Sequence, residues 1–289
     1  MQPLCLTGPT LKTNLHTHTT FSDGTFTLAQ VVAAYEALEY DVLAITDHNR
    51  WQDHTSASTG RVLVLSSNEP SLAQREHLLA LGVHQTSPVD AGERDRSSSR
   101  TQEVIDWINE QSGFSVLNHP AWSGMPVDRL LELERYHAIE VCNAGCTGHG
   151  SEFSLTHWDE LLRRGRRVWG LATDDSHYDW DRGLGWVELF CERTEAAVIR
   201  ALHEGRFYAT MGPRFEHIEC DGETLRLRCD PVMGIAVLSE QGPIKVVHGG
   251  FGTVDGLEWK LPDRGHRYVR VELHRADGKK AWSNPIWAD

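Results

Sequence analysis

The sequence predicts an α/β barrel followed by a small antiparallel β module. About seven apolar, β-prone segments alternate with helical patterns over roughly the first 210 residues, and such alternation is typical of parallel strands joined by right-handed crossovers. Polar residues able to bind metal follow the ends of several of these segments. We favour a barrel because the carboxyl ends of its strands converge on one face, whereas those of an open sheet spread along an edge.

The composition indicates a soluble globular protein. Its 289 residues suffice for one large domain with a small appendage, and 40% hydrophobic with 24% charged residues is ordinary for this class. A net charge of −13 without a run of Lys or Arg argues against binding of duplex nucleic acid. No segment is apolar enough to span a membrane, and residues 1–13 lack the features of a signal peptide. Six scattered cysteines favour free thiols in a reducing cytoplasm.

Strand and helix signals alternate along the first half of the chain. Thr27 is a predicted N-cap, since apolar residues at helical spacing follow it as far as Leu38. The segments 51–60 and 83–100 are rich in polar and turn-forming residues, and we expect loops there, the second one a lid. The other predicted elements of this half are strands over 11–18, 41–46, 61–67 and 77–81, and a helix that Thr101 caps and Gly113 ends.

The alternation continues to about residue 205 and then changes. Predicted strands cover 114–117, 138–142, 168–172 and 186–190, and predicted helices cover 126–136, 156–164 and 195–204. From Glu216 the pattern is that of antiparallel strands, with a hairpin turn at Asp277-Gly278. We therefore expect a barrel domain over residues 1–215 and a small β-sandwich-like module over residues 216–289.

Histidines and carboxylates follow the predicted strands. The first pair, His16 and His18, flanks Thr17, and residues i and i+2 of an extended segment point the same way, so both imidazoles project together. The full candidate set contains six imidazoles and three carboxylates: His16, His18, Asp23, His48, Glu69, His77, His119, Asp175 and His177.

This set predicts a metal centre. Nitrogen and oxygen donors without thiolates suit a catalytic Zn²⁺, Mn²⁺ or Fe²⁺ site rather than a structural zinc site. Nine ligands exceed the needs of one ion of about four to six ligands, so we expect two to three divalent ions, with Glu69 as a bridge. Three carboxylates and three divalent ions would leave a charge of about +3, which favours a small anionic substrate.

The motifs around these residues closely resemble those of the PHP (polymerase and histidinol phosphatase) superfamily. They are H-x-H at His16, S-D-G at Asp23, T-D-H-N at His48, N-E-P-S at Glu69, H-L-L-A-L-G at His77, N-H-P at His119 and D-S-H at Asp175. The resemblance covers roughly residues 11–213 and implies a distorted (β/α)7 barrel with a trinuclear site. The tail, around residues 281–287, is similar to that of a PHP subgroup containing carbaryl hydrolases.

The resemblance also implies how the ligands are shared. One ion would take His16, His18, Glu69 and Asp175; a second would take Glu69, His77 and His119; a third would take Asp23, His48 and His177. Asp174 is the alternative to Asp175 as a metal ligand, but the D-x-H spacing favours Asp175. All nine positions are filled, as expected of an active member.

Some of these residues also have a plain structural interpretation. His77 stands in an apolar run and could be a core histidine, and Asp23 could be a turn residue. We expect Asp47 to support or cap neighbouring groups. Asn143 and Arg182 are candidates for substrate contact. Exposed, non-functional histidines are expected at His54, His84 and His149. The arginines of the lid, Arg94, Arg96 and Arg100, could bind a phosphate, but we favour a solvated charge cluster.

The favoured function is a phosphoesterase, in which a metal-bound hydroxide attacks phosphorus and Asp174 protonates the leaving oxygen. The alternative is a carbamate, ester or amide hydrolase that uses the same hydroxide on carbon. Phosphate needs Arg or Lys near the metals, whereas an aryl carbamate needs an apolar wall, for which Trp51 and Trp122 are candidates. A non-enzymatic metal-binding module is the third interpretation.

Overall fold

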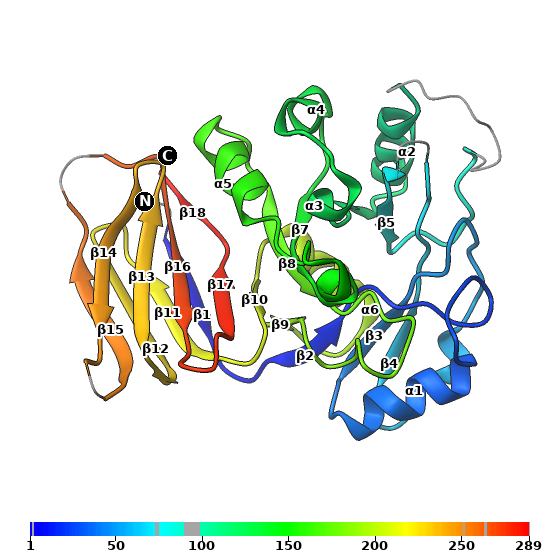
Figure 1. Ribbon diagram of the computed structural model, residues 1–289, viewed down its shortest axis with the longest axis horizontal. Coiled ribbons are helices and arrows are strands. Elements are labelled where there is room, and N and C mark those ends of the chain that lie inside the picture. The colour runs from blue at the N-terminus through cyan, green and yellow to red at the C-terminus, as the bar shows by residue number, and fades with distance from the viewer. Residues whose placement is uncertain (2, 73–74, 90–98, 251, 263–264, 289) are drawn as a thin grey trace.

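The computed structural model describes residues 1, 3–72, 75–89, 99–250, 252–262 and 265–288. Helices gather in one half of the molecule, and β-strands dominate the other half, where both chain ends lie (Figure 1). Within the described residues the strands form one ten-stranded and two four-stranded sheets. The α/β class predicted from the sequence is therefore confirmed.

Two runs of parallel strands form the frame of the helical half. The first run consists of β2 (Leu11–Asn14), β3 (Val42–Ile45) and β4 (Leu63–Ser66). The second consists of β6 (Phe114–Leu117), β7 (Ala138–Asn143) and β8 (Trp169–Thr173), with β5 (Leu78–Leu81) antiparallel to β6. Every residue of β3, β5, β6 and β7 is buried, which is why β3 and β5 are continuously apolar and β6 and β7 are mostly apolar instead of alternating.

The two runs face each other, but their ladders do not close into a barrel. Asn68, just after β4, forms an isolated bridge with Ala80 of β5, and Thr17, after β2, forms an isolated bridge with Ser176, after β8. The edge of β2 that β8 would need is taken by β9 (Trp186–Leu189), which pairs with β2 in antiparallel orientation. The predicted distorted (β/α)7 barrel is therefore not confirmed in the described residues.

Helices cover the two runs largely where the sequence predicts them. Thr27 caps α1 (Leu28–Ala37) in a capping box with Gln30, as predicted. The second helix, α2 (Ser99–Glu110), begins before its predicted cap, because the Thr101 hydroxyl donates to Glu76 instead. The others are α3 (Pro120–Ser123), α4 (Val127–Glu132), α5 (Leu155–Arg163) and α6 (Glu195–His203), with 3-10 turns η1 (Thr55–Ala57) and η3 (Ala144–His149).

Two predictions about helices and loops need correction. The predicted helix over 126–136 stops at Glu132, because Leu133 has an extended backbone. The expected lid over 83–100 reaches α2 at Ser99, and its residues 90–98 lie outside the described residues. None of the helices in the described part of the chain is long and apolar enough to cross a membrane.

The C-terminal strands are antiparallel, as predicted. The ten-stranded sheet continues from β9 through β10 (Phe207–Thr210), β17 (Lys280–Ser283), β16 (Tyr268–His274), β13 (Gly234–Ser239) and β14 (Gly242–His248), and β18 (Ile286–Trp287) pairs with β16. A separate sheet contains β1 (Leu4–Thr7), β11 (Phe215–Cys220), β12 (Thr224–Val232) and β15 (Val254–Lys260). The predicted division at residue 215 stays a prediction.

A buried arginine joins the C-terminal strands to the helical half. Arg270 of β16 is fully buried, and its guanidinium lies 2.6 Å from Asp159 of α5 and 2.7 Å from Glu272. It also lies 4.7 Å from the centre of a Trp158 ring. Pairing on both sides is what makes burial of this charge tolerable.

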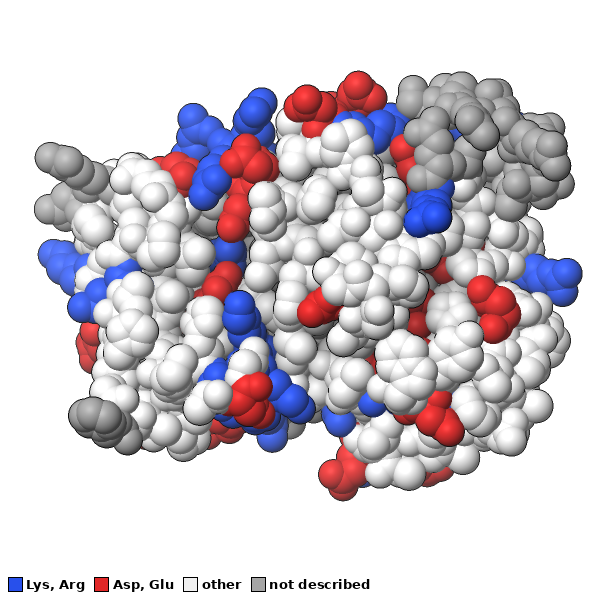
Figure 2. All heavy atoms as spheres, in the orientation of Figure 1, with Lys and Arg blue, Asp and Glu red and all other residues white. Residues whose placement is uncertain are grey.

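On the face drawn in Figure 2, Lys and Arg of the described residues are interspersed with Asp and Glu and with wide uncharged areas.

Candidate metal centre

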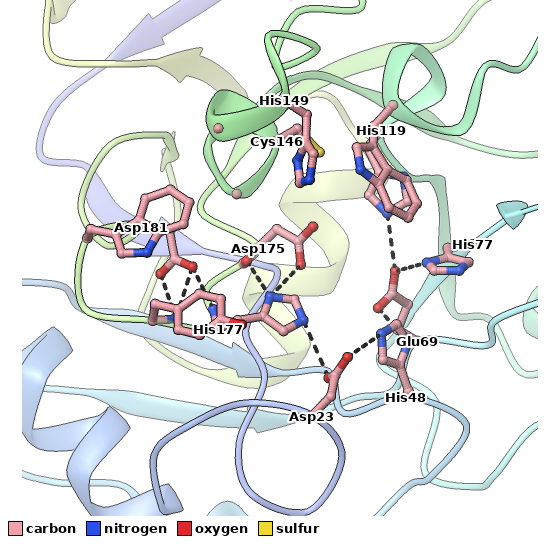
Figure 3. A pocket seen from close by; sticks show the side chains of 15 residues that line it. Asp23, His48, Glu69, His77, His119, Cys146, His149, Asp175, His177 and Asp181 are labelled. Carbon is pink, nitrogen blue, oxygen red and sulfur yellow. Dashed lines mark hydrogen bonds and ion pairs between the residues drawn. The ribbon is translucent and has the colours of Figure 1, made fainter.

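The nine predicted ligands lie close together, and seven of them, all but His16 and His18, line a cavity of about 530 Å³ (Figure 3). His16 and His18 follow β2, His48 follows β3 and Glu69 follows β4. His119 follows β6, and Asp175 and His177 follow β8. The remaining two lie on loops, Asp23 before α1 and His77 before β5. Segments up to 161 positions apart (16 to 177) thus meet at one place.

Glu69 and Asp175 bring the first group together. Nε2 of His16 and Nε2 of His18 each lie 3.2 Å from Oε2 of Glu69 and 3.2 Å from Oδ1 of Asp175. The side chains of His16, His18 and Glu69 are at most 1% exposed. Two imidazoles and two carboxylates therefore point into one small buried space.

The other oxygen of Glu69 faces a second group. Oε1 lies 3.1 Å from Nδ1 of His77 and 3.6 Å from Nε2 of His119, and it accepts a hydrogen bond from the Asn118 amide. His77 is therefore part of the site and not of the apolar core. Because its two oxygens face different imidazoles, Glu69 lies between the first group and the second group and connects them.

Asp23 joins the third group at the mouth of the cavity. Its carboxylate lies 3.5 Å from Nε2 of His48 and 3.4 Å from Nε2 of His177, as the dashed lines of Figure 3 show. The Asp23 side chain is 54% exposed, so this group is more open to solvent than the first. Nδ1 of His48 in turn lies 2.9 Å from Oε2 of Glu69, which links the third group to the others.

The donor atoms of the first group fit a metal cation. Nε2 of His16, Nε2 of His18 and Oε2 of Glu69 are buried without a hydrogen-bond partner, although buried polar atoms are nearly always paired. Imidazole nitrogens and carboxylate oxygens are the donors of catalytic Zn²⁺, Mn²⁺ and Fe²⁺ sites. Three sets of donor atoms lie close enough together to bind one ion each: His18, Asp23, His48 and His177; His16, His18 and Asp175; and His48, Glu69 and His77. The described residues can therefore bind divalent metal.

The electrostatics of the site also favour a cation. Burial alone would raise the pKa of Glu69, but the imidazoles of His16, His48 and His77 hold that pKa well below its usual range. Burial would lower the pKa of His16, but the nearby carboxylates raise it well above its usual range. The ionised carboxylates thus stabilise positive charge in this cavity, whether it is carried by imidazolium or by a metal ion.

A further buried carboxylate, Glu140, was missed by the sequence prediction. It accepts hydrogen bonds from Nδ1 of His16 at 2.7 Å, the backbone N of His119 at 2.8 Å, the Asn143 amide at 2.8 Å and the Thr173 hydroxyl at 2.7 Å. Glu140 stands in the middle of β7 and not at a strand end. A single charged residue inside a buried strand was nevertheless an available signal, because such a charge must be paired.

Two other residues support the ligands from behind. Asp47 accepts hydrogen bonds from the backbone N and the hydroxyl of Thr19 and from the Ser22 hydroxyl, which confirms its predicted supporting role. The Asn143 amide donates to Glu140 and to Oδ2 of Asp175. Asn143 therefore positions carboxylates, and substrate contact is not its role in this arrangement.

The backbone of the site is strained at two ligands. His119 and Asp175 have φ angles of 31° and 50°, in the left-handed region that non-glycine residues rarely adopt. Such conformations cost on the order of 1–3 kcal/mol each and persist where surrounding contacts impose them. The site also requires a glycine at position 24, because a Cβ there would lie 2.5 Å from the backbone carbonyl carbon of His18.

The prediction that Asp174 is the general acid does not fit its position. Its carboxylate is fully buried and accepts hydrogen bonds from the backbone N of residues 183, 184 and 185 and from the hydroxyls of Tyr35 and Tyr40. Burial raises its pKa to about 6, and the backbone hydrogen bonds oppose that shift. Asp174 does not line the cavity, so we assign it to holding the loop after β8.

Aromatic side chains form much of the cavity wall. Trp122, Tyr178 and Trp180 line it together with His149 and Cys146. Among the described residues no Lys or Arg lines it. The prediction for Trp122 is thus confirmed, whereas Trp51 lies outside the lining and donates its indole N–H to Ser66.

Arg182, a predicted substrate contact, does not line the cavity. Arg182 pairs with Asp179 and lies over the Phe26 ring. Arg94 and Arg96 lie outside the described residues. Of the three histidines expected to be exposed, His84 and His149 are exposed, but His149 lines the cavity, and His54 is buried 5.2 Å from Phe21.

A known structure shares this fold, and others are similar over part of it. The chain is similar to a two-domain protein from Bacteroides vulgatus that contains a predicted PHP-like metal-dependent phosphoesterase, with 17% identity, a TM-score of 0.53, and coverage of 96% of this chain and 95% of that one. A provisionally assigned metal-dependent phosphoesterase from Bifidobacterium adolescentis matches at 18% identity and an amidohydrolase from Chromobacterium violaceum at 17%; each has a TM-score of 0.43 and covers 57% of this chain and 87% of its own.

No family model and no curated protein sequence matches the chain. The similarity to the Bacteroides vulgatus protein extends over both the helical half and the C-terminal strands, since it covers nearly the whole chain. The predicted likeness to carbaryl hydrolases stays a prediction. The chain has the fold of a two-domain PHP-like protein, which confirms the resemblance to the PHP superfamily at the level of the fold.

Proposed function

We propose that the protein is a metal-dependent hydrolase and that the nine-residue ligand set is its catalytic centre. The observation that carries this proposal is the convergence of buried Nε2 atoms of His16 and His18 with the carboxylates of Glu69 and Asp175, at 3.2 Å for each pair. Two imidazoles and two carboxylates that point into one buried space are the donor set of a catalytic metal site.

The ligand groups suggest a trinuclear centre of Zn²⁺, Mn²⁺ or Fe²⁺. Oε2 of Glu69 faces the first group and Oε1 faces the second, so this carboxylate would bridge two ions. Asp23 faces the imidazoles of His48 and His177, which would complete a third position. The proposed ligand sets are His16, His18, Glu69 and Asp175; Glu69, His77 and His119; and Asp23, His48 and His177.

Divalent ions in this centre would lower the pKa of bound water and polarise the substrate oxygen that accepts charge in the reaction. The protein's own residues prepare the site for this chemistry. Glu140 and Asn143 fix the orientation of His16 and Asp175, and Trp122, Tyr178 and Trp180 form an aromatic wall of the cavity.

A phosphate ester is our favoured substrate class. Three carboxylates and three divalent ions would give the centre a charge of about +3, so that the ions themselves attract an anionic small molecule. The Bacteroides vulgatus protein, whose fold this chain shares, is described as containing a phosphoesterase, which supports the same class.

A carbamate, ester or amide hydrolase is the second candidate, because one observation favours it. No Lys or Arg of the described residues lines the cavity, whereas a phosphate is commonly bound by such side chains. A neutral carbonyl substrate would not need them. The two candidates share the ligand set and differ only in the group that is attacked.

The proposal can be tested with two chromogenic substrates that share a leaving group. Purified protein loaded with Zn²⁺, Mn²⁺ or Fe²⁺ is offered p-nitrophenyl phosphate and p-nitrophenyl acetate. We expect turnover of the phosphate, lost in His18→Ala and retained in His84→Ala, since His84 is an exposed histidine outside the cavity. Turnover of the acetate alone would favour the second candidate. Loss of neither activity in His18→Ala would contradict the assigned centre.

A further inference from the structure

The aromatic side chains at the mouth of the cavity are exposed without an evident structural purpose. Tyr178 and Trp180 are 51% and 54% exposed, the largest fractions among the exposed large hydrophobic residues of the described chain. Their rings stack with centroids 6.0 Å apart and planes inclined by 10°. Exposed aromatic surface that lines a cavity is typical of a binding site, because its burial by a ligand is favourable.

A third aromatic residue, Trp122, lines the cavity on the side of His119. Its ring lies 4.8 Å from the His119 ring in an edge-to-face arrangement, and the Arg75 guanidinium lies 5.1 Å from its centre. These contacts fix the indole in place. Tyr178, by contrast, lies beside His177, at 6.4 Å between ring centres. Figure 3 shows His119 and His177 on different sides of the cavity.

The η3 turn connects these two aromatic sides. The His149 ring lies 6.4 Å from Trp122, and the Trp180 ring approaches Gly148, where an added Cβ would lie 3.9 Å from it. Trp122, His149, Trp180 and Tyr178 therefore form a nearly continuous aromatic rim, all of whose members line the same cavity. We call these four residues the aromatic rim.

The rim offers flat aromatic faces, with polar groups only at the edges of its rings. These groups are the indole N–H of each tryptophan, the hydroxyl of Tyr178 and the ring nitrogens of His149. The carboxylate of Asp181, which also lines the cavity, already accepts hydrogen bonds from the backbone N of His177 and of Tyr178. A planar aromatic ring of a substrate can stack on these faces.

We propose that the substrate carries a planar aromatic group, which stacks on the aromatic rim while its scissile ester lies over the metal ligands. This inference rests on the proposed hydrolase function and adds the substrate class. The cavity volume of about 530 Å³ can hold a small molecule that carries one planar aromatic group. In this arrangement the metal ligands bind the scissile ester, and the aromatic rim contacts the rest of the substrate.

The first test compares benzyl phosphate with cyclohexylmethyl phosphate, which have similar size and similar leaving alcohols but differ in aromaticity. We expect a KM for benzyl phosphate about 2- to 10-fold lower, with similar kcat. Trp180→Leu and Trp122→Leu should each remove this preference. Trp51→Leu is the matched control, since this indole lies outside the cavity lining, and it should retain the preference. Equal KM values in the wild-type protein would overturn the inference.

The second test does not depend on hydrolysis. Metal-free protein is titrated by calorimetry with 2-naphthol and with its saturated counterpart, decahydro-2-naphthol. Saturable binding of the aromatic compound alone, weakened about 2- to 10-fold in Trp180→Leu, would support the rim even if no phosphate ester were turned over. Equal binding of both compounds, or binding unchanged in both rim variants, would reject the rim and leave the hydrolase proposal standing.

Discussion

The Glu140 carboxylate lies 2.7 Å from Nδ1 of His16, and both side chains are fully buried. The Nδ1–H group of His16 donates a hydrogen bond to Glu140, so Nε2 is the ring nitrogen that faces Glu69 and Asp175. A carboxylate behind a histidine ligand fixes both the tautomer and the ring orientation. The same carboxylate holds the backbone of His119, so Glu140 joins two of the proposed ligand groups.

Replacement of Glu140 by Gln should weaken metal binding. The amide keeps the shape of the side chain but removes the charge and one acceptor. The ring of His16 is then no longer held in one tautomer and one orientation. We expect metal affinity to fall by about 10- to 100-fold. Competition against a chromogenic chelator measures this directly, without any enzymatic assay.

A matched variant separates metal binding from general stability. Glu188 is also buried, and it accepts hydrogen bonds from Thr10 and from the Trp186 indole, away from the cavity. Glu188→Gln should lower the free energy of unfolding and leave metal affinity unchanged. An equal loss of affinity in both variants would show that Glu140 acts only through stability.

Asp174→Asn should destabilise the fold without removing a catalytic proton donor. Its carboxylate accepts three backbone hydrogen bonds from residues 183–185, and the amide can satisfy only some of them. Loss of buried hydrogen-bond partners costs about 1–3 kcal/mol, which urea unfolding would measure. The pH–rate profile should keep its shape. Disappearance of its basic limb in Asp174→Asn would restore the interpretation of Asp174 as the general acid.

Gly24→Ala should disturb the site although it adds only one methyl group. That methyl would meet the backbone C and O of His18 at 2.5 and 2.6 Å, and backbone atoms cannot easily move aside. Overpacking of this kind costs about 1–3 kcal/mol. Gly60→Ala is the control, since a Cβ there has no neighbour within 4 Å. Urea unfolding of both variants checks the prediction, and equal stability of the two would contradict it.

The frame of the site could be predicted because seven of the nine candidate ligands follow short strands, and only Asp23 and His77 do not. His16, His48 and His119 were found in this way, since apolar runs such as β3 and β6 are buried on both faces and end where polar residues begin. The cap at Thr27 was predictable because its partner Gln30 is only three positions away. These features depend on local sequence.

The features that were missed depend on contacts between distant segments. Glu140 is defined by partners at positions 16, 119 and 173, and Asp174 by tyrosines that are more than 130 positions away. The failure to close a barrel arises because β9 pairs with β2 across up to 178 positions (11 to 189). Spacing along one sequence contains no information about such partners.

His137 should make stability depend on pH in the mildly acidic range. Burial lowers its pKa to about 4, and the neighbouring His203 adds to that shift. Nδ1 of His137 accepts hydrogen bonds from the Ser115 backbone and hydroxyl, which requires the neutral ring. Because the unfolded chain binds this proton at higher pH than the folded chain, the stabilisation is present above pH of about 6.5 and is lost as pH falls toward 4.

The variant His137→Asn keeps an acceptor near Nδ1 but cannot titrate. Between pH 6.5 and pH 4, the wild-type protein should lose about 1–2 kcal/mol more stability than the variant, after allowance for partial exposure of the ring. Urea unfolding at a series of pH values provides the comparison. Identical pH dependence of the two proteins would show that His137 does not contribute.

The metal content of the purified protein tests the central claim most directly. Elemental analysis of protein dialysed against metal-free buffer should find about two to three divalent ions per chain, and fewer in Glu69→Gln, because Glu69 faces imidazoles with both of its oxygens. Glu188→Gln should keep the wild-type content. A wild-type protein that retains no transition metal, even after incubation with Zn²⁺, Mn²⁺ and Fe²⁺, would contradict the assignment of these nine residues as a metal centre.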